Sequence, residues 1–145
     1  MSTRQRLNGE RGAALLEAAI TIPMILLISV AIFEFGRAFQ TWQVLTNAAR
    51  EGARIAVIAG TTDAQVNTRV RDYLAGGGLT LARSQSVQVN IQRNVPLGAS
   101  NASRITITYP FNFMVLNPVV RLVTPASTLG GPLSMGATAL MRNEN

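Results

Sequence analysis

The stretch from Ala13 to Phe33 constrains this chain more than any other part of it. It reads AALLEAAITIPMILLISVAIF, and Glu17 is its only ionisable residue. At about 1.5 Å per residue, a helix of this length spans about 30 Å, which is the thickness of a bilayer core. A soluble helix of the same length would need a polar face, and this segment has almost none. The sequence therefore predicts one membrane-spanning helix over residues 13–33.

The residues that flank this span indicate its orientation. Three arginines lie in the polar leader of residues 1–12, just before the span, whereas only Arg37 and Arg50 follow it closely enough to compare. Because basic residues collect on the cytoplasmic side, we expect a cytoplasmic N-terminus and a body outside the cytoplasm. Glu34 and Arg37 are three residues apart, which predicts a weak ion pair at the point where the membrane ends.

The next part of the chain predicts two helices in succession. Helical rhythm continues past the span until Gly60, so we expect one long helix over residues 13–60 whose second part is amphipathic. Thr62 and Gln65 have the spacing of a capping box at the start of a second helix. Gly76–Gly78 ends that helix.

The C-terminal half predicts a small sheet. Apolar and polar residues alternate over residues 87–91, 105–109 and 133–142, which is typical of half-buried strands. Residues 110–132 are apolar but interrupted by prolines, and they form either a short helix over the sheet or a segment that dips towards the membrane. We therefore expect an α+β fold, in which residues 61–145 form a small head domain with a second helix and a three-stranded, mainly antiparallel sheet.

The composition excludes several classes of function. The chain contains no Cys and no His, so it has no disulfide, no His-containing zinc site and no Ser-His-Asp triad. All of its basic residues are Arg and the net charge is +6, but these residues are spread along the chain without a cluster. We expect neither an enzyme nor a cofactor or metal site, and no nucleic-acid partner.

A row of small residues follows the span. Ala48 and Gly52 are four residues apart, with other small residues beside them, so that a helix or sheet can approach closely. Packing against strands of the same domain is the favoured interpretation, and contact with a partner is the alternative. Arg50 and Arg54 are expected on the exposed side, most simply as a solvated pair. The candidate packing or partner face comprises Ala48, Ala49, Arg50, Gly52, Ala53 and Arg54.

The most informative motif lies where the leader meets the span. Gly12 precedes the apolar run, and Glu17 is the fifth residue after it. This resembles the processing site of type IV prepilins, where a membrane-embedded aspartic peptidase cuts after the glycine and leaves the helix attached. The resemblance implies cleavage between Gly12 and Ala13, and pairing of Glu17 with the free amine of Ala13 in a neighbouring subunit. The simpler alternative is that Glu17 reaches water near the headgroups, because a carboxylate inside a membrane is costly.

A wider resemblance covers residues 11–60. RGAALLEAAITIPMILLISVAIFEFGRAF, followed by NAAREGARIAV, is similar to the TadE-like family of minor pilin-like proteins from the Tad (Flp) pilus machinery. The resemblance implies a type IV pilin-like fold and a pseudopilin that helps to assemble or prime the fibre. Major Flp pilins are shorter and commonly have Tyr at the position of Ala18, so the bulk pilus subunit is not expected.

The same resemblance implies partners and a location. The partners would be other pilin-like subunits, the Tad inner-membrane assembly platform, prepilin peptidase and the lipid bilayer. The chain would be a single-pass protein of the bacterial inner membrane with a periplasmic C-terminal domain, and it could be incorporated into a surface pilus.

Two alternatives to a processed pseudopilin remain open. One is an inner-membrane assembly factor that keeps its leader. The other is a secreted domain released by ordinary signal peptidase after Ser29-Val30-Ala31, so that it begins at Ile32. The N-terminal residue of the mature protein separates these possibilities.

Overall fold

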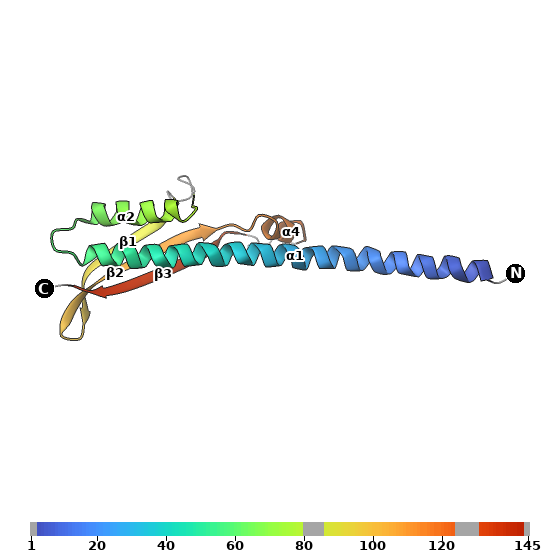
Figure 1. The fold of residues 1–145 in the computed structure, drawn as a ribbon, viewed down its shortest axis with the longest axis horizontal. Helices are drawn as coiled ribbons and strands as arrows, with labels where there is room; N and C mark the ends of the chain where they lie inside the picture. The colour runs from blue at the N-terminus through green and yellow to red at the C-terminus, as the bar shows by residue number, and fades with distance from the viewer. Residues whose placement is uncertain (1–2, 80–85, 124–130, 144–145) are drawn as a thin grey trace.

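The computed structural model describes residues 3–79, 86–123 and 131–143, with side chains from residue 11 onward. Figure 1 shows a long rod, α1, whose C-terminal half carries the other elements and whose N-terminal half projects beyond them. This confirms the predicted α+β fold with a long N-terminal helix. The elements are, in chain order, α1 (Thr3–Ala56), α2 (Asp63–Gly76), β1 (Gln88–Leu97), β2 (Ser100–Phe111), α4 (Leu116–Val123) and β3 (Leu133–Arg142).

The three strands form one antiparallel sheet in the order β1-β2-β3. β3 has the predicted bounds, whereas β1 and β2 are longer than the alternation predicted. A short turn joins β1 to β2, with Leu97 paired to Ser100. The register shifts between Gln92 and Val95, and Asn94 between them has a φ of 56°. A bulge of this kind bends and twists the strand locally.

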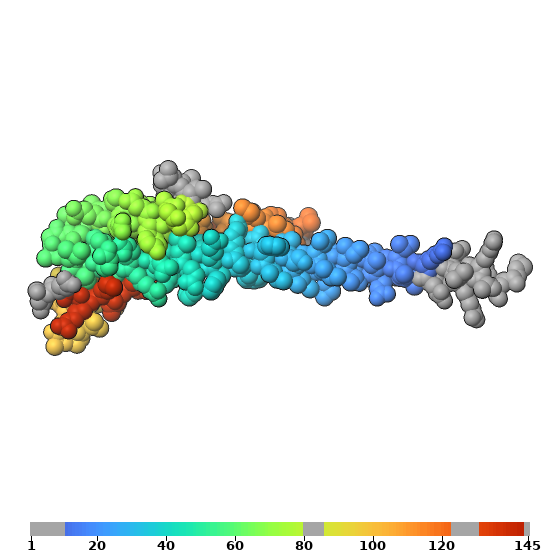
Figure 2. All heavy atoms as spheres, in the orientation of Figure 1, coloured from blue at the N-terminus to red at the C-terminus, as the bar shows by residue number. Residues whose placement is uncertain are grey.

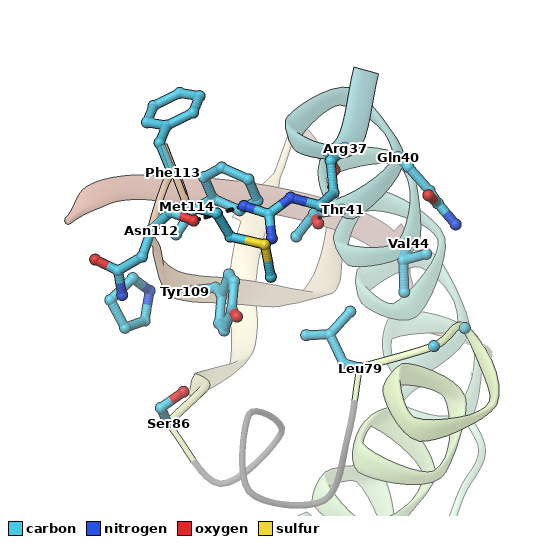
Figure 3. Close-up of a pocket in the computed structure, with 14 residues that line it drawn as sticks. Arg37, Gln40, Thr41, Val44, Leu79, Ser86, Tyr109, Asn112, Phe113 and Met114 are labelled. Carbon is cyan, nitrogen blue, oxygen red and sulfur yellow. Dashed lines mark hydrogen bonds between the residues drawn. The ribbon is translucent and has the colours of Figure 1, made fainter. Parts of the chain in front are cut away.

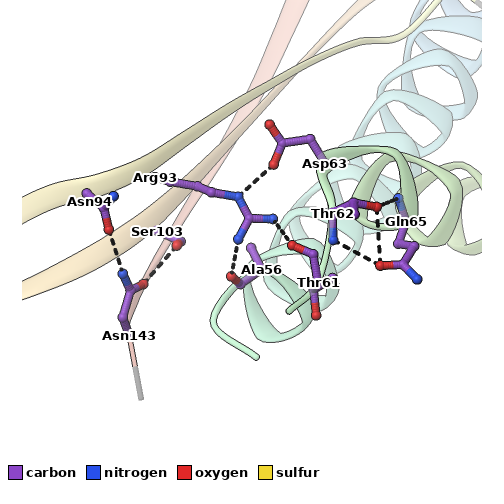
Figure 4. Close-up of polar contacts among 9 residues, drawn as sticks. All are labelled: Ala56, Thr61, Thr62, Asp63, Gln65, Arg93, Asn94, Ser103 and Asn143. Atoms are coloured by element: carbon purple, nitrogen blue, oxygen red, sulfur yellow. Dashed lines mark hydrogen bonds and ion pairs between the residues drawn. The ribbon is translucent and has the colours of Figure 1, made fainter. Parts of the chain in front are cut away.

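The turn between α1 and α2 follows the local sequence closely. α1 ends at Ala56, four residues before the predicted end, and Gly60 takes a φ of 81° in the turn that follows. The capping box is confirmed: the Gln65 amide donates to Thr62 Oγ1 at 3.3 Å, and the Thr62 amide donates to Gln65 Oε1 at 2.9 Å (Figure 4). Two donors at the start of α2 are thereby satisfied.

Arg93 of β1 closes the same turn from the side of the sheet. Its guanidinium donates to the carbonyl oxygens of Ala56 at 2.9 Å and Thr61 at 2.8 Å, and to Asp63 Oδ1 at 2.6 Å (Figure 4). The end of a helix leaves carbonyls without intrahelical partners, and a basic side chain can satisfy them. Arg93 thus connects the end of α1, the start of α2 and the sheet.

The core lies between the two long helices and one face of the sheet. The largest fully buried side chains come from all three: Leu45 of α1, Leu74 of α2, and Ile105 and Ile107 of β2. Strand β1 alternates between exposed and partly buried residues, as period-two patterning requires. The second half of α1 is therefore a core element of the head domain, whereas its first half lies outside that core.

Candidate functional site

The first half of α1 presents apolar side chains to its surroundings. Leu15 is 72% exposed and Phe33 is 80% exposed, and large apolar residues between them are exposed as well. Within the described residues, α1 is the one helix long and apolar enough to cross a membrane. Since such a surface is unfavourable in water, the helix is suited to anchoring the chain in a bilayer.

The residues of the predicted processing motif lie on this exposed helix. Gly12, Ala13 and Glu17 are all exposed, within the continuous helix that runs from Thr3 to Ala56. A Cβ added at Gly12 would meet no heavy atom within 4 Å. Glu17 has no ion-pair or hydrogen-bond partner among the side chains that the structure describes. The motif is therefore free to contact other molecules.

The end of the span is joined to the head domain by Glu34. This carboxylate is only 5% exposed, and its Oε1 accepts hydrogen bonds from the backbone amides of Met114 and Val115, both at 2.8 Å. Arg37 lies 3.2 Å from its Oε2 and also donates to the Asn112 carbonyl at 2.7 Å. The predicted ion pair is thus present, but it is the centre of a junction between α1 and the segment that leads into α4.

Aromatic rings pack around this junction. The Arg37 guanidinium lies 5.1 Å from the centroid of the Phe111 ring, within the range of a cation–π contact. Phe113 makes edge contacts with Phe111 at 5.1 Å and with Phe35 of α1 at 5.7 Å. The segment between β2 and α4 is therefore fixed to α1 by both polar and aromatic contacts.

A pocket lies beside the junction, and Figure 3 shows its lining residues. Its volume is about 560 Å³. Arg37, Thr41 and Val44 of α1 line one side, and the end of β2 from Tyr109 lines another. Arg37 is the only charged group among the described lining residues, and Glu34 and Asn112 already bind it. The described lining offers no acid–base pair. Elsewhere in the described part of the chain, no group of three acidic residues is placed to hold a metal ion.

The row of small residues lies inside the head domain. Ala48, Ala49, Gly52 and Ala53 are buried. A Cβ added at Gly52 would lie 2.6 Å from Cγ2 of Val70 and 3.4 Å from Cγ2 of Ile105. These residues let α2 and the sheet approach α1, which is the packing that the sequence favoured. Arg50 and Arg54 are exposed, so contact with a partner remains a prediction for these two arginines.

Comparison with known proteins bears on this helix. Residues 12–54 match the family model described as TadE-like protein. The chain is similar to the TadE-like family over this stretch, which is less than half of its length. No curated protein and no solved structure matched it. The matched region contains the predicted processing motif, the apolar span and the Glu34–Arg37 junction.

The TadE-like region also carries a charge cluster that joins α1 to α2. Glu51 accepts two hydrogen bonds from Arg54, at 2.9 and 2.8 Å, and Arg69 of α2 lies 2.9 Å away. The hydrogen bonds from Arg54, and then those from Arg69, lower the pKa of Glu51 from 4.5 to about 2. Arg54, one of the two arginines predicted to be exposed, therefore forms an ion pair with Glu51 of its own helix.

Proposed function

We propose that this chain is a minor pilin-like component, a pseudopilin, of Tad pilus biogenesis, and that it contributes to assembly or priming of the fibre through α1. The observation that carries the proposal is that the TadE-like match coincides with a helix whose apolar side chains are exposed. Such a helix is stable in a bilayer or packed against other apolar helices. A pseudopilin uses both environments, first in the membrane and then in the assembly.

In this proposal the N-terminus is cytoplasmic and the head domain is periplasmic. The arginines of residues 1–12 support this orientation, because basic residues are retained on the cytoplasmic side of a membrane. The partners are other pilin-like subunits and the Tad inner-membrane platform, with prepilin peptidase as the processing enzyme.

Glu17 has a specific role in this proposal. Its carboxylate lies about one helical turn inside the apolar span, where an unpaired charge is costly. Cleavage after Gly12 gives Ala13 a free α-amino group. Pairing of that amine with Glu17 of a neighbouring chain neutralises both charges and sets the axial register of the two helices. The exposure of Glu17 in the single chain leaves it available for this contact.

The test is the N-terminal residue of the protein purified from membranes of cells that contain a prepilin peptidase. Mass spectrometry should find a chain that begins at Ala13. Gly12→Leu should leave the precursor uncut, and the open space around Gly12 means that this change does not disturb the fold. Gly36→Leu is the matched control, because Gly36 lies on the same helix with equally open surroundings.

The other possible N-termini identify the alternatives. A wild-type chain that keeps Met1 indicates an unprocessed assembly factor, and one that begins at Ile32 indicates a domain released by ordinary signal peptidase. Normal cleavage of the Gly12→Leu variant would show that Gly12 is not part of the processing site.

A further inference from the structure

Helix α4 is amphipathic in the opposite sense to a helix on a soluble surface. Val115, just before its first residue, and Val119 and Leu122 within it are spaced four and three residues apart, so they share one face. That face is exposed, and Leu122 is 84% exposed. Asn117 lies on the other side, is only 8% exposed and donates from its amide to the Gly131 carbonyl at 3.4 Å. Asn117 thus faces the protein, whereas Val115, Val119 and Leu122 face outward.

The position of α4 in the molecule is as informative as its pattern. Figures 1 and 2 show it beside α1 at the end of the head domain from which the apolar half of α1 projects. The Glu34 carboxylate accepts from the amides of Met114 and Val115, directly before α4. Glu34 is also the first residue after the predicted span. The hydrogen bonds therefore hold the start of α4 at the level where the apolar span ends.

Exposed aromatic residues lie at this level and within about 12 Å beyond it along α1. Phe33, Phe35, Phe39 and Trp42 of α1 are exposed, and Phe39 and Trp42 pack against each other with ring centroids 6.0 Å apart. Aromatic residues collect where a membrane meets water. Phe35 also contacts Phe113, which lies in the segment that leads to α4. The apolar surface of α4 is therefore a lateral extension of the surface at the outer end of the span.

We propose that α4 is an interfacial foot: it lies flat on the outer leaflet, with Val115, Val119 and Leu122 in the boundary between headgroups and acyl chains. This extends the proposed function, since it rests on insertion of α1 in a bilayer. Lipid is the occupant that fits, because the start of α4 is held at the end of the span, beside the exposed apolar half of α1. A short helix with one apolar face binds such a boundary in the plane of the membrane.

The chain contains no cysteine, so single cysteines can be introduced and labelled with a nitroxide. The full-length chain is reconstituted in vesicles of phosphatidylcholine and phosphatidylglycerol as Val119→Cys or Leu122→Cys. Leu26→Cys is the control within the span, and Ala64→Cys, exposed on α2, is the control in water. Spin-label accessibility is measured to oxygen, which partitions into lipid, and to a water-soluble nickel chelate.

Labels at Val119 and Leu122 should favour oxygen severalfold more than the label at Ala64, and should lie at a shallower depth than the label at Leu26. If both α4 labels have the accessibility of a label in water while the Leu26 label has that of a label in lipid, α4 does not contact the membrane although α1 is inserted. This result would overturn the proposal for α4 and leave the membrane insertion of α1 supported. Labels at α4 that neither reagent reaches also overturn the proposal for α4, because protein then covers this face. A Leu26 label outside lipid overturns the anchor and the foot together.

Discussion

The side chain of Glu34 connects the apolar span of α1 to the head domain. It is the first residue after the apolar span, yet its carboxylate is buried against backbone amides about 80 positions later in the chain. A buried carboxylate is tolerated only when hydrogen bonds and charge compensate for its lost hydration. Two amides and Arg37 provide this compensation. The residue thus orients the head domain relative to the anchor.

Glu51 gives a prediction about pH at the same scale. Its pKa is lowered to about 2 in the folded chain. Because the folded pKa lies below that of the unfolded chain, the stabilisation is complete above about pH 4.5 and is lost as the pH falls towards 2. Thermal unfolding of the detergent-solubilised chain should therefore show a steeper loss of stability between about pH 5 and 2 in the wild type than in Glu51→Gln. Parallel curves for the two proteins would contradict this.

At the scale of elements, the close approach of α2 and the sheet to α1 depends on Gly52. In Gly52→Ala the new Cβ would lie 2.6 Å from Cγ2 of buried Val70, so either this side chain or the two helices must shift. We expect a destabilisation of about 1–3 kcal/mol, which is usual for overpacking. In Gly36→Ala, with open space around the position, we expect no loss and a gain of up to about 1 kcal/mol from helix propensity.

Chemical denaturation followed by circular dichroism, with the full chain in micelles, measures both variants. Equal stability of Gly52→Ala and the wild type would show that Val70 can move aside at no cost. A loss in Gly36→Ala as large as that in Gly52→Ala would mean that the packing argument is wrong.

The sequence predicted those elements whose signals are local. The apolar span, the capping box of Thr62 and Gln65 and the alternation of the strands each depend on neighbouring residues, and each is present in the structure. Arg93 and the hydrogen bonds of Glu34 were missed because their partners lie 30 or more residues away. The sequence did not distinguish whether the segment that contains α4 covers the sheet or faces the membrane. Its pattern shows which face is apolar, but not whether protein or lipid contacts that face.

At the scale of the whole molecule, the family match covers only α1, and the head domain is known from the structure alone. The match stops at residue 54, before α2 and all three strands. The packing of the head domain on α1 therefore could not be inferred from the family match, and the tertiary contacts in the structure define it. Of the predicted site residues, the structure places the small ones in the core and leaves Gly12, Ala13 and Glu17 on the free surface.

The proposed pairing of Glu17 with a neighbouring chain predicts how Glu17 variants assemble. Glu17→Ala and Glu17→Gln should insert in the membrane as the wild type does, because each removes a charge from the apolar span. Both should reduce co-purification of crosslinked pilin-like subunits severalfold, since the amine of the neighbouring chain loses its counter-charge. Thr21→Ala, in the same exposed span, is the control and should assemble normally. Unchanged assembly of both Glu17 variants would exclude the pairing.

The continuity of α1 has a mechanical consequence. From Ala13 to Ala56 the helix is about 65 Å long at about 1.5 Å per residue, and its far end is clamped by Arg93 and packed on the sheet. A pull on the anchor therefore loads the head domain in shear along the whole helix–sheet contact, where many contacts resist at once.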